Sequence, residues 1–241
     1  MTLTTGKRAL ITGASSGIGK ATALAFAKTG VNLALVGRSL DKLEAVASAA
    51  RQTGVEAKTY ALDLAQVHVV PEKMAAIAAD CGAIDILVNS AGMGYTGALS
   101  ATPLPDWQKV IDLNLTSVFG CILAVLPTMH QRGSGTIINV ASIAGQTPFP
   151  NWGAYSVSKA GLIALSKTLA AEESARGIRV TTICPGAVNT ELWDSETVQH
   201  NFDRNAMLTP EIVAQSIVHT ALLPTPAAIA ELTLMPGGGA L

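Results

Sequence analysis

The sequence predicts an α/β fold: a single-domain, doubly wound parallel sheet with helices on both faces. Short apolar runs alternate with longer amphipathic segments along the chain, which is the pattern of strands joined by helices. The short runs are almost continuously apolar, as strands are when both faces of a parallel sheet are covered. With 241 residues, 49% of them hydrophobic, the chain is long enough to bury one ordinary core. We therefore expect one domain over residues 1–241.

Each expected element follows from its periodicity and from the residues that flank it. Strands are predicted at 8–12, 31–36, 56–62, 85–89, 136–140, 179–183 and 232–235. Helices are predicted at 17–29, 40–52, 66–80, 106–131, 152–175 and 210–223. Gly30 suits a C-cap and Pro105 a helix start, whereas Pro127 is expected to kink its helix or end it early. The polar, turn-rich segment 186–208 is typical of a lid over a binding site.

Composition excludes several classes of function. A net charge of −1 without runs of like charge argues against a nucleic-acid partner. No segment has eighteen uninterrupted apolar residues, and the N-terminus lacks the pattern of a signal peptide, so we expect no membrane span and a cytoplasmic location. Cys81, Cys121 and Cys184 are widely spaced, which favours reduced, buried thiols over disulfides. The four histidines are scattered and predict no metal site.

A glycine-rich turn joins the first predicted strand to the first helix. It reads Thr12-Gly13-Ala14-Ser15-Ser16-Gly17-Ile18-Gly19, and its spacing differs from the common G-x-G-x-x-G fingerprint. Gly13 permits a tight turn, Gly17 permits close approach of a pyrophosphate, and Gly19 permits close packing of helix on strand. The helix N-terminus would then offer free N–H groups to an anion. The turn predicts a dinucleotide site, although a glycine-rich turn without a ligand has the same composition.

The end of the second strand predicts which dinucleotide binds. NAD sites usually have Asp or Glu here, and NADP sites have Arg for the 2′-phosphate. The strand ends Val36-Gly37-Arg38-Ser39 without a carboxylate. Arg38 could clamp a phosphate with two charge-assisted hydrogen bonds, and the Ser15 and Ser39 hydroxyls could add donors. We therefore expect NADP(H) as the cofactor, with a solvated loop arginine as the alternative.

Tyr155 and Lys159 are four residues apart in the helix predicted at 152–175, and Ser142 precedes the tyrosine by thirteen residues. Four residues are about one helical turn, so the phenol and the ammonium share a helix face. A nearby ammonium stabilises phenolate and is expected to lower the tyrosine pKa, which would make the phenol a workable general acid or base. Taken alone, such a pair also fits a solvated helix face.

Together, these motifs resemble the short-chain dehydrogenase/reductase family over residues 7–238, with the Rossmann-type fold. Asn89-Ser90-Ala91-Gly92 resembles the family's Asn-Asn-Ala-Gly motif with one serine replacement. The resemblance identifies four catalytic residues, which are Asn114, Ser142, Tyr155 and Lys159. It implies cofactor contacts, beyond Arg38 and Ser39, from Gly13, Ser15, Ser16, Gly17, Ile18, Gly19, Asp63, Leu64, Asn89, Ala91, Gly92, Tyr155, Lys159, Pro185, Gly186, Val188 and Thr190.

The resemblance implies a division of labour among the four catalytic residues. Tyr155 would donate a proton to a carbonyl oxygen and Ser142 would hydrogen-bond the same oxygen. Lys159 would lower the tyrosine pKa and hold the nicotinamide ribose. Asn114, through its backbone carbonyl in a kinked helix, would position a water that relays protons to Lys159. The expected reaction is the NADPH-dependent reduction of ketones or aldehydes, in which the cofactor supplies the hydride.

The substrate is less well specified by the sequence. Besides Ser142, the expected pocket walls are large side chains in a chain that is only 4% aromatic, and they favour an apolar carbonyl compound: Met93, Tyr95, Phe149, Trp152, Leu192 and Trp193. A second candidate is a 3-oxoacyl-(acyl carrier protein) reductase, for which Arg132 and Arg176 would contact the acidic carrier; ordinary helix-end charge is their alternative role. A third is a cofactor-binding regulator, which would be expected to lack one of the catalytic four.

Family resemblance also implies a homotetramer in which the helices predicted at 106–131 and 152–175 pair across a two-fold axis. Small and apolar residues such as Ala160, Leu162 and Leu165 fit this pairing and fit burial against the sheet equally well. The expected partners are therefore a small carbonyl or alcohol substrate, further copies of the chain and, for the second candidate function, acyl carrier protein.

Overall fold

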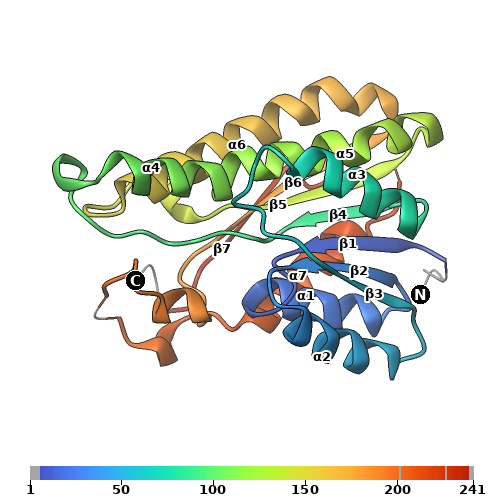
Figure 1. Ribbon diagram of the computed structural model, residues 1–241, viewed down its shortest axis with the longest axis horizontal. Coiled ribbons are helices and arrows are strands. Elements are labelled where there is room, and N and C mark those ends of the chain that lie inside the picture. The colour runs from blue at the N-terminus through green and yellow to red at the C-terminus, as the bar shows by residue number, and fades with distance from the viewer. Residues whose placement is uncertain (1–5, 201, 226, 239–241) are drawn as a thin grey trace.

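The computed structural model describes residues 6–200, 202–225 and 227–238. The strands in these residues form one seven-stranded sheet (Figure 1). All strand pairs are parallel, in the order β3-β2-β1-β4-β5-β6-β7. The strands are β1 (Arg8–Thr12), β2 (Asn32–Gly37), β3 (Ala57–Ala61), β4 (Ile86–Asn89), β5 (Gly135–Val140), β6 (Ile178–Pro185) and β7 (Glu231–Leu234). The predicted fold class is confirmed.

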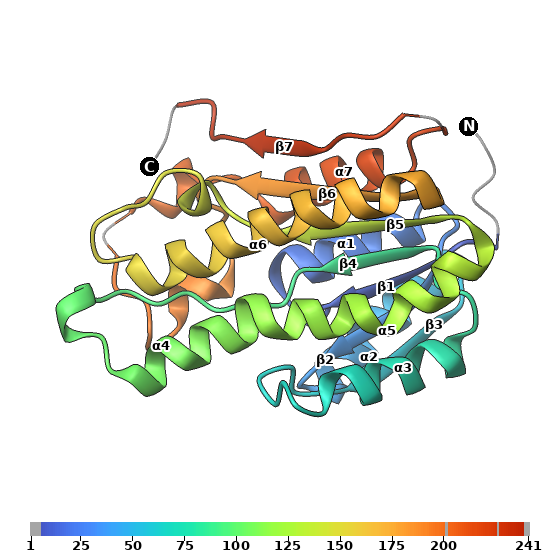
Figure 2. The same ribbon diagram turned by 90° about the horizontal axis from the view of Figure 1, so that it is seen from above.

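Helices cover both faces of the sheet, as Figure 2 shows from above. The helices are α1 (Gly17–Ala27), α2 (Leu40–Arg51), α3 (Val70–Cys81), α4 (Leu104–Ile111), α5 (Ser117–Arg132), α6 (Gly153–Glu173) and α7 (Pro210–Ala221). Alternate residues of β1 divide the core: Ala9 and Ile11 pack with α1, α2 and α7, whereas Leu10 packs with α3, α5 and α6. This alternation follows from the two-residue period of a strand, and it explains why β1 is apolar throughout.

A π-helical turn, Asp112–Thr116, joins α4 to α5, so that Leu104–Arg132 is one continuous helix. Pro127 lies inside α5 and does not end it, which corrects the prediction of an early end. By length and composition this helix could cross a membrane, but half of its most apolar window is buried within the protein. Residues such as Ile122 and Val125 belong to the core beneath α5, and this burial accounts for the apolar composition.

The strand order reverses between β1 and β4, and the site lies at the carboxyl ends of these strands. Thr12 pairs with Asn89 across the two strands. The Thr12 hydroxyl accepts hydrogen bonds from the N–H groups of Ser90 and Ala91 at 3.1 and 3.2 Å. These bonds fix the path of the chain after β4, where the sequence predicted cofactor contacts.

Candidate active site

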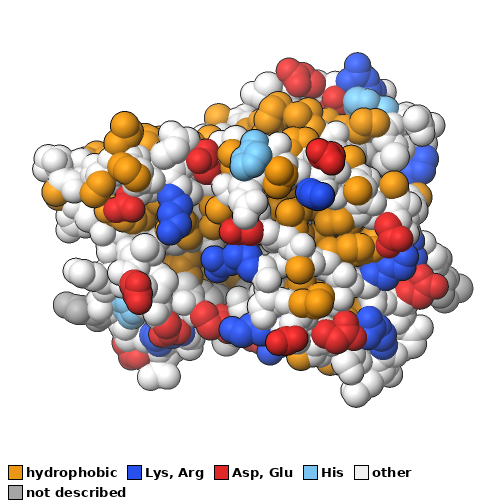
Figure 3. Space-filling model, in the orientation of Figure 1, with side chains coloured by type: hydrophobic (Ala, Val, Ile, Leu, Met, Phe, Trp, Pro, Cys, Tyr) orange, Lys and Arg blue, Asp and Glu red, His pale blue; other side chains and the backbone are white. Residues whose placement is uncertain are grey.

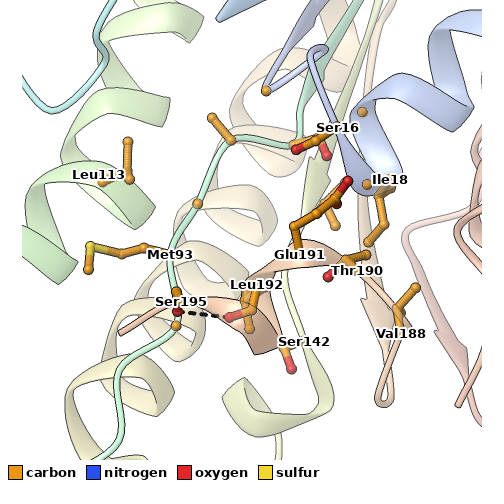
Figure 4. A pocket seen from close by; sticks show the side chains of 18 of the residues that line it. Ser16, Ile18, Met93, Leu113, Ser142, Val188, Thr190, Glu191, Leu192 and Ser195 are labelled. Atoms are coloured by element: carbon orange, nitrogen blue, oxygen red, sulfur yellow. Dashed lines mark hydrogen bonds between the residues drawn. The ribbon is translucent and has the colours of Figure 1, made fainter. Parts of the chain in front are cut away.

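A cavity of about 880 Å³ lies across the carboxyl ends of the strands. Its walls come from the glycine turn before α1, the loops after β2, β3, β4 and β5, the start of α6, and the segment after β6. Figure 4 shows Met93 and Leu113 on one side, Ser16, Ile18 and Val188 on the opposite side, and Leu192 and Ser142 between them. Segments far apart in sequence therefore meet around one space large enough for a dinucleotide and a small molecule.

The glycine turn has the close backbone packing that a cofactor cradle needs. Gly13 has a φ of +65°, and a Cβ there would lie 2.8 Å from the Ala91 Cα. A Cβ on Gly19 would overlap the Gly13 carbonyl oxygen. Helix α1 begins at Gly17, and the side chain of its N-cap, Ser16, makes no capping hydrogen bond. The first N–H groups of α1 can therefore face an anion in the cavity, and the residues present fit a pyrophosphate.

Arg38 lies exposed on the cavity wall after β2. Its guanidinium forms no ion pair or hydrogen bond with any of the described residues, whereas Ser39 caps α2 by accepting a bond from the Lys42 N–H at 3.4 Å. Lys42 also lines the cavity, although it was not predicted as a cofactor contact. Its position in the first turn of α2, four residues after Arg38, could have indicated this. Asp63, also on the wall, accepts from the Ala65 N–H at 3.1 Å. Two cations therefore adjoin this end of the cavity.

Asn89 is the one predicted cofactor contact that does not line the cavity. It is buried in the sheet, where its amide nitrogen donates to Asn139 Oδ1 at 2.8 Å, and Asn139 in turn donates to Ser166 Oγ at 2.8 Å. This chain of polar groups joins β4, β5 and α6. Asn89 therefore acts on the site through the sheet, because buried amides need such partners, and the predicted direct contact is corrected.

Ser142, Tyr155 and Lys159 all line the same cavity. Ser142 follows β5, and its Oγ accepts a hydrogen bond from the Ala144 N–H at 3.1 Å. Tyr155 and Lys159 lie in the first two turns of α6. The Lys159 ammonium donates to the Val140 carbonyl oxygen at 2.9 Å and lies 5.7 Å from the centre of the Tyr155 ring. The three side chains predicted to act together are thus brought together by β5 and α6.

Burial dominates the electrostatics of this group. It raises the pKa of the Tyr155 phenol, and a hydrogen bond with Ser142 opposes the rise. It also lowers the pKa of Lys159 to about 8, because a buried ammonium is poorly solvated. The four-residue spacing from Lys159 predicted a lowered tyrosine pKa. In the folded protein the pKa of Tyr155 is raised instead, because desolvation of the phenolate is the dominant effect, and the phenol stays protonated at neutral pH.

Asn114 lies in the π-helical turn and is fully buried, behind the cavity wall. Its side chain accepts from the Met93 N–H at 2.8 Å and donates to the Met93 carbonyl at 2.9 Å and to Ser158 Oγ at 3.0 Å. These bonds tie the segment after β4 to α6. The π turn, a feature often found at functional sites, is the kink on which the predicted backbone role of Asn114 depends.

The substrate end of the cavity contains five of the predicted wall residues besides Ser142: Met93, Phe149, Trp152, Leu192 and Trp193. Tyr95 does not line it; its hydroxyl donates to Asp106 at 3.3 Å, so this prediction is corrected. Phe202 and Leu113 line the cavity without having been predicted. Phe202 lay within the predicted lid, and its aromatic side chain among polar neighbours was the signal that could have identified it.

The segment after β6 closes on itself at its base, as a lid would. Val188 and Leu208 form an isolated parallel bridge. Arg204 holds the interior through an ion pair with Asp194 at 2.5 Å and hydrogen bonds to Asn189 Oδ1 and the Thr190 carbonyl at 2.8 and 2.9 Å. Pro185, Gly186, Val188 and Thr190 line the cavity, where the resemblance placed cofactor contacts.

Arg132 and Arg176 do not flank the cavity. Arg132 ends α5 and pairs with Asp85 at 2.9 Å, before β4. Arg176 pairs with Glu173 at 2.9 Å, beyond the end of α6; at 1.5 Å per residue it lies roughly 30 Å along the helix from Tyr155. Figure 3 shows both signs of charge interspersed over the face it draws. Within one chain, neither arginine lies beside the cavity, which was the position predicted for contacts with a carrier protein.

Comparison with known proteins agrees with this geometry. Residues 7–201 match the family model described as short chain dehydrogenase. A 3-oxoacyl-[acyl-carrier-protein] reductase from Synechocystis sp. is 38% identical over 99% of this chain and 98% of its own length. The alcohol dehydrogenase of the archaeon Thermococcus sibiricus, complexed with 5-hydroxy-NADP, is 31% identical with a TM-score of 0.87, covering 96% of this chain and 97% of that one.

A structure of NAD⁺-bound xylitol dehydrogenase is also similar, with 28% identity and a TM-score of 0.85 over 98% of this chain and all of the other. The similar structures thus include proteins with either nicotinamide dinucleotide, and overall similarity does not select between them. The family model spans most of the sequence. Three of the four residues that the family resemblance predicted as catalytic, Ser142, Tyr155 and Lys159, line one cavity, and Asn114 lies behind its wall. The chain therefore belongs to the short-chain dehydrogenase family of oxidoreductases.

Proposed function

We propose that this protein is an NADPH-dependent reductase that converts ketones or aldehydes to alcohols, with Tyr155 as the general acid. One observation carries the proposal: the same cavity is lined by the Ser142, Tyr155 and Lys159 side chains and by the unpaired Arg38 guanidinium. The first group suits a carbonyl oxygen, and the second suits a phosphate. A ligand that extends from Arg38 to Tyr155 would have a phosphate at one end and its reacting part at the other.

The residues that would hold the cofactor follow the length of the cavity. Arg38 and Lys42 would take the 2′-phosphate, and the first N–H groups of α1, together with the Gly13 turn, would take the pyrophosphate. Lys159 would meet the ribose beside the nicotinamide. When bound, NADPH supplies the hydride for the carbonyl carbon. The high pKa of Tyr155 keeps its proton available for the carbonyl oxygen, and Ser142 steadies that oxygen as charge develops.

The decisive test is turnover of a carbonyl panel with NADPH and with NADH, followed by absorbance, for the unaltered protein and for Tyr155→Phe. We expect a higher kcat/KM with NADPH and a fall in kcat of about 10²-fold or more in the variant, because the ring remains and only the proton donor is lost. Near-original turnover by Tyr155→Phe would mean that the acid lies elsewhere. Better use of NADH would overturn the cofactor assignment.

A second candidate, reduction of carrier-linked 3-oxoacyl groups, is favoured by the 38% identity to the Synechocystis protein. The positions of Arg132 and Arg176 weigh against it within a single chain, because both lie away from the cavity and already have acidic partners. Comparing turnover of a carrier-linked 3-oxoacyl thioester with that of simple ketones separates the two. A non-catalytic regulator is disfavoured by the presence of all four catalytic residues, and NADPH oxidation with any carbonyl compound would exclude it.

We further propose a homotetramer in the cytoplasm. Phe119 and Leu123 are 47% and 44% exposed on one face of α5, and Val157 is 47% exposed on α6. Residues four apart on a helix are neighbours, so Phe119 and Leu123 form a joint apolar surface suited to a second copy of the chain. The three cysteines are buried and free, which suits a reducing compartment. Sedimentation equilibrium tests the assembly, and Phe119→Lys is expected to weaken it.

A further inference from the structure

A chain of aromatic rings leads away from the catalytic tyrosine. The rings of Trp152 and Tyr155 have centroids 5.4 Å apart and planes inclined at 67°. Trp152 meets Trp193 at 5.7 Å and 71°, and Trp193 meets Phe202 at 5.6 Å and 86°. All four residues line the cavity. Each contact has the edge-to-face geometry that aromatic pairs prefer, so a continuous series of rings extends from the ring of Tyr155 along the cavity lining.

The wall formed by these rings is held rigidly. The Trp193 indole N–H donates to the Val188 carbonyl at 2.7 Å. The lid around Trp193 is bonded to the segment after β4, because the Thr96 N–H donates to the Thr197 carbonyl at 2.8 Å and the Thr197 hydroxyl donates to the Gly94 carbonyl at 2.7 Å. A ligand that packs on this wall therefore has little side-chain or loop motion to arrest on binding, which favours affinity.

Gly94 lets the lid close tightly over this end of the cavity. A Cβ there would lie 2.6 Å from Val198 Cγ2 and 2.9 Å from Leu192 Cδ2. The lid and the segment after β4 are therefore in direct contact, and this contact completes the apolar enclosure that Phe149 and Met93 begin.

Charge is distributed unevenly along the cavity. Among the described residues, its charged lining consists of Arg38, Lys42, Asp63, Lys159 and Glu191. The first three follow β2 and β3, Glu191 lies beside Gly17 at the start of α1, and Lys159 is committed to the Val140 carbonyl. Among the described residues, the cavity lining at the aromatic end has the hydroxyls of Ser142, Tyr155 and Ser195 and no side chain with a formal charge other than that of Lys159. The ring of His200 lies 4.8 Å from that of Trp193 but does not line the cavity. An ionised group of a substrate would be poorly solvated there and would be disfavoured relative to a neutral one.

We infer that the preferred substrate class is a neutral aryl ketone, whose flat ring packs against Trp152 and Trp193 while its carbonyl oxygen meets Tyr155 and Ser142. The inference rests on the proposed function and narrows it from carbonyl compounds in general to ketones that carry an aromatic ring beside the carbonyl. The ring of the substrate then extends the edge-to-face series that begins at Tyr155.

The test compares acetophenone with cyclohexyl methyl ketone, which have the same carbon skeleton and differ in ring aromaticity. The ratio of their kcat/KM values is measured in the unaltered protein and in Trp193→Leu and Trp152→Leu. Comparing ratios between proteins removes the intrinsic difference in ketone reactivity. We expect the aryl preference to fall about fivefold in each variant, since each loses one ring contact. Trp107→Leu is the matched control, because Trp107 lies on α4 and does not line the cavity.

An unchanged ratio in both cavity variants would overturn the inference and leave the proposed function intact. If the unaltered protein reduces neither ketone, the proposed reductase activity towards these ketones is wrong. The preference for an aromatic ring is then tested by ligand binding instead of turnover. Dissociation constants of both ketones are then measured by calorimetry with NADP⁺ present. Tighter binding of acetophenone that is lost in Trp193→Leu and kept in Trp107→Leu supports an aryl site, and equal binding of the two ketones overturns it.

Discussion

The two ends of the cavity are built in different ways. The end with Arg38 is formed by turns that each follow a strand, and the decisive feature of each turn, such as Gly13 with its φ of +65° or Arg38, lies within a few residues of the end of that strand. The aromatic end is assembled from three distant segments, and the hydrogen bond from Thr96 to Thr197 spans 101 residues. Local sequence therefore determines the first end, whereas tertiary packing of the lid determines the second.

Lys159 lies between the two ends of the cavity. Its burial can be tested through the pH dependence of the unfolding free energy. Its pKa in the folded protein is about 8, below the ordinary lysine value of 10.5, so the unfolded chain binds more protons between these two pH values. Stability therefore rises with pH through this window. Relative to Lys159→Met, the unaltered protein should gain about 3 kcal/mol in unfolding free energy between pH 7 and pH 10.5, an order-of-magnitude value. Urea denaturation of both proteins at several pH values measures it.

Using the difference between the two proteins cancels the contributions of groups that do not interact with Lys159, such as Tyr60. If the difference in unfolding free energy between the two proteins does not vary with pH, Lys159 remains solvated in the folded protein. The cavity would then be wet at its centre, and the high pKa of Tyr155 would lose its explanation, because the same burial raises it.

Replacing Arg38 tests whether the end of the cavity that contains it determines the choice of cofactor independently of the aromatic end. Arg38→Gln removes the charge and the paired donors, so the Kd for NADPH should rise by about tenfold or more while the Kd for NADH stays nearly constant. Cofactor fluorescence titration measures both constants without turnover. Arg176→Gln is the matched control, since Arg176 is distant from the cavity. Equal losses for both cofactors would indicate that Arg38 supports the loop instead of reading the phosphate.

The sequence predicted the features that depend on neighbours along the chain. Strand positions came out within one or two residues, and the Tyr155–Lys159 spacing placed both side chains on one cavity wall. Of the two alternatives predicted for Pro127, a kink or an early end, the early end is wrong, because the helix continues to Arg132 with buried contacts that a proline rule does not weigh. The helix predicted at 66–80 begins only at Val70, since residues 66–69 form hydrogen-bonded turns instead.

Errors at the site have a common physical origin in tertiary contacts. Tyr95 is adjacent to the lining residue Gly94, but its hydroxyl is drawn to Asp106. The sign of the Tyr155 pKa shift depends on desolvation, which spacing alone does not reveal. Arg132 and Arg176 occupy the predicted helix ends, yet those ends point away from the cavity. In each case the residue was identified correctly and its surroundings were not.

Glu191 is where the lid reaches the phosphate end, and it gives the smallest predicted effect. Figure 4 shows its side chain extending from the lid towards Ser16 and Ile18, and a Cβ on Gly17 would lie 3.6 Å from Glu191 Oε2. A carboxylate at the start of α1 is stabilised by the helix dipole and repels an arriving pyrophosphate. Glu191→Gln should therefore tighten NADPH binding by roughly threefold at low salt, with a smaller gain at high salt.

Glu196→Gln is the matched control, because Glu196 belongs to the same lid but does not line the cavity. Fluorescence titration of NADPH at two ionic strengths separates the outcomes. Weaker binding in Glu191→Gln alone would mean that the carboxylate holds a hydroxyl of the cofactor and does not repel its phosphates. The lid would then contribute to the affinity for NADPH at the end of the cavity that contains Arg38. That end would no longer be determined by local sequence alone, and the contrast between the two ends of the cavity would fail.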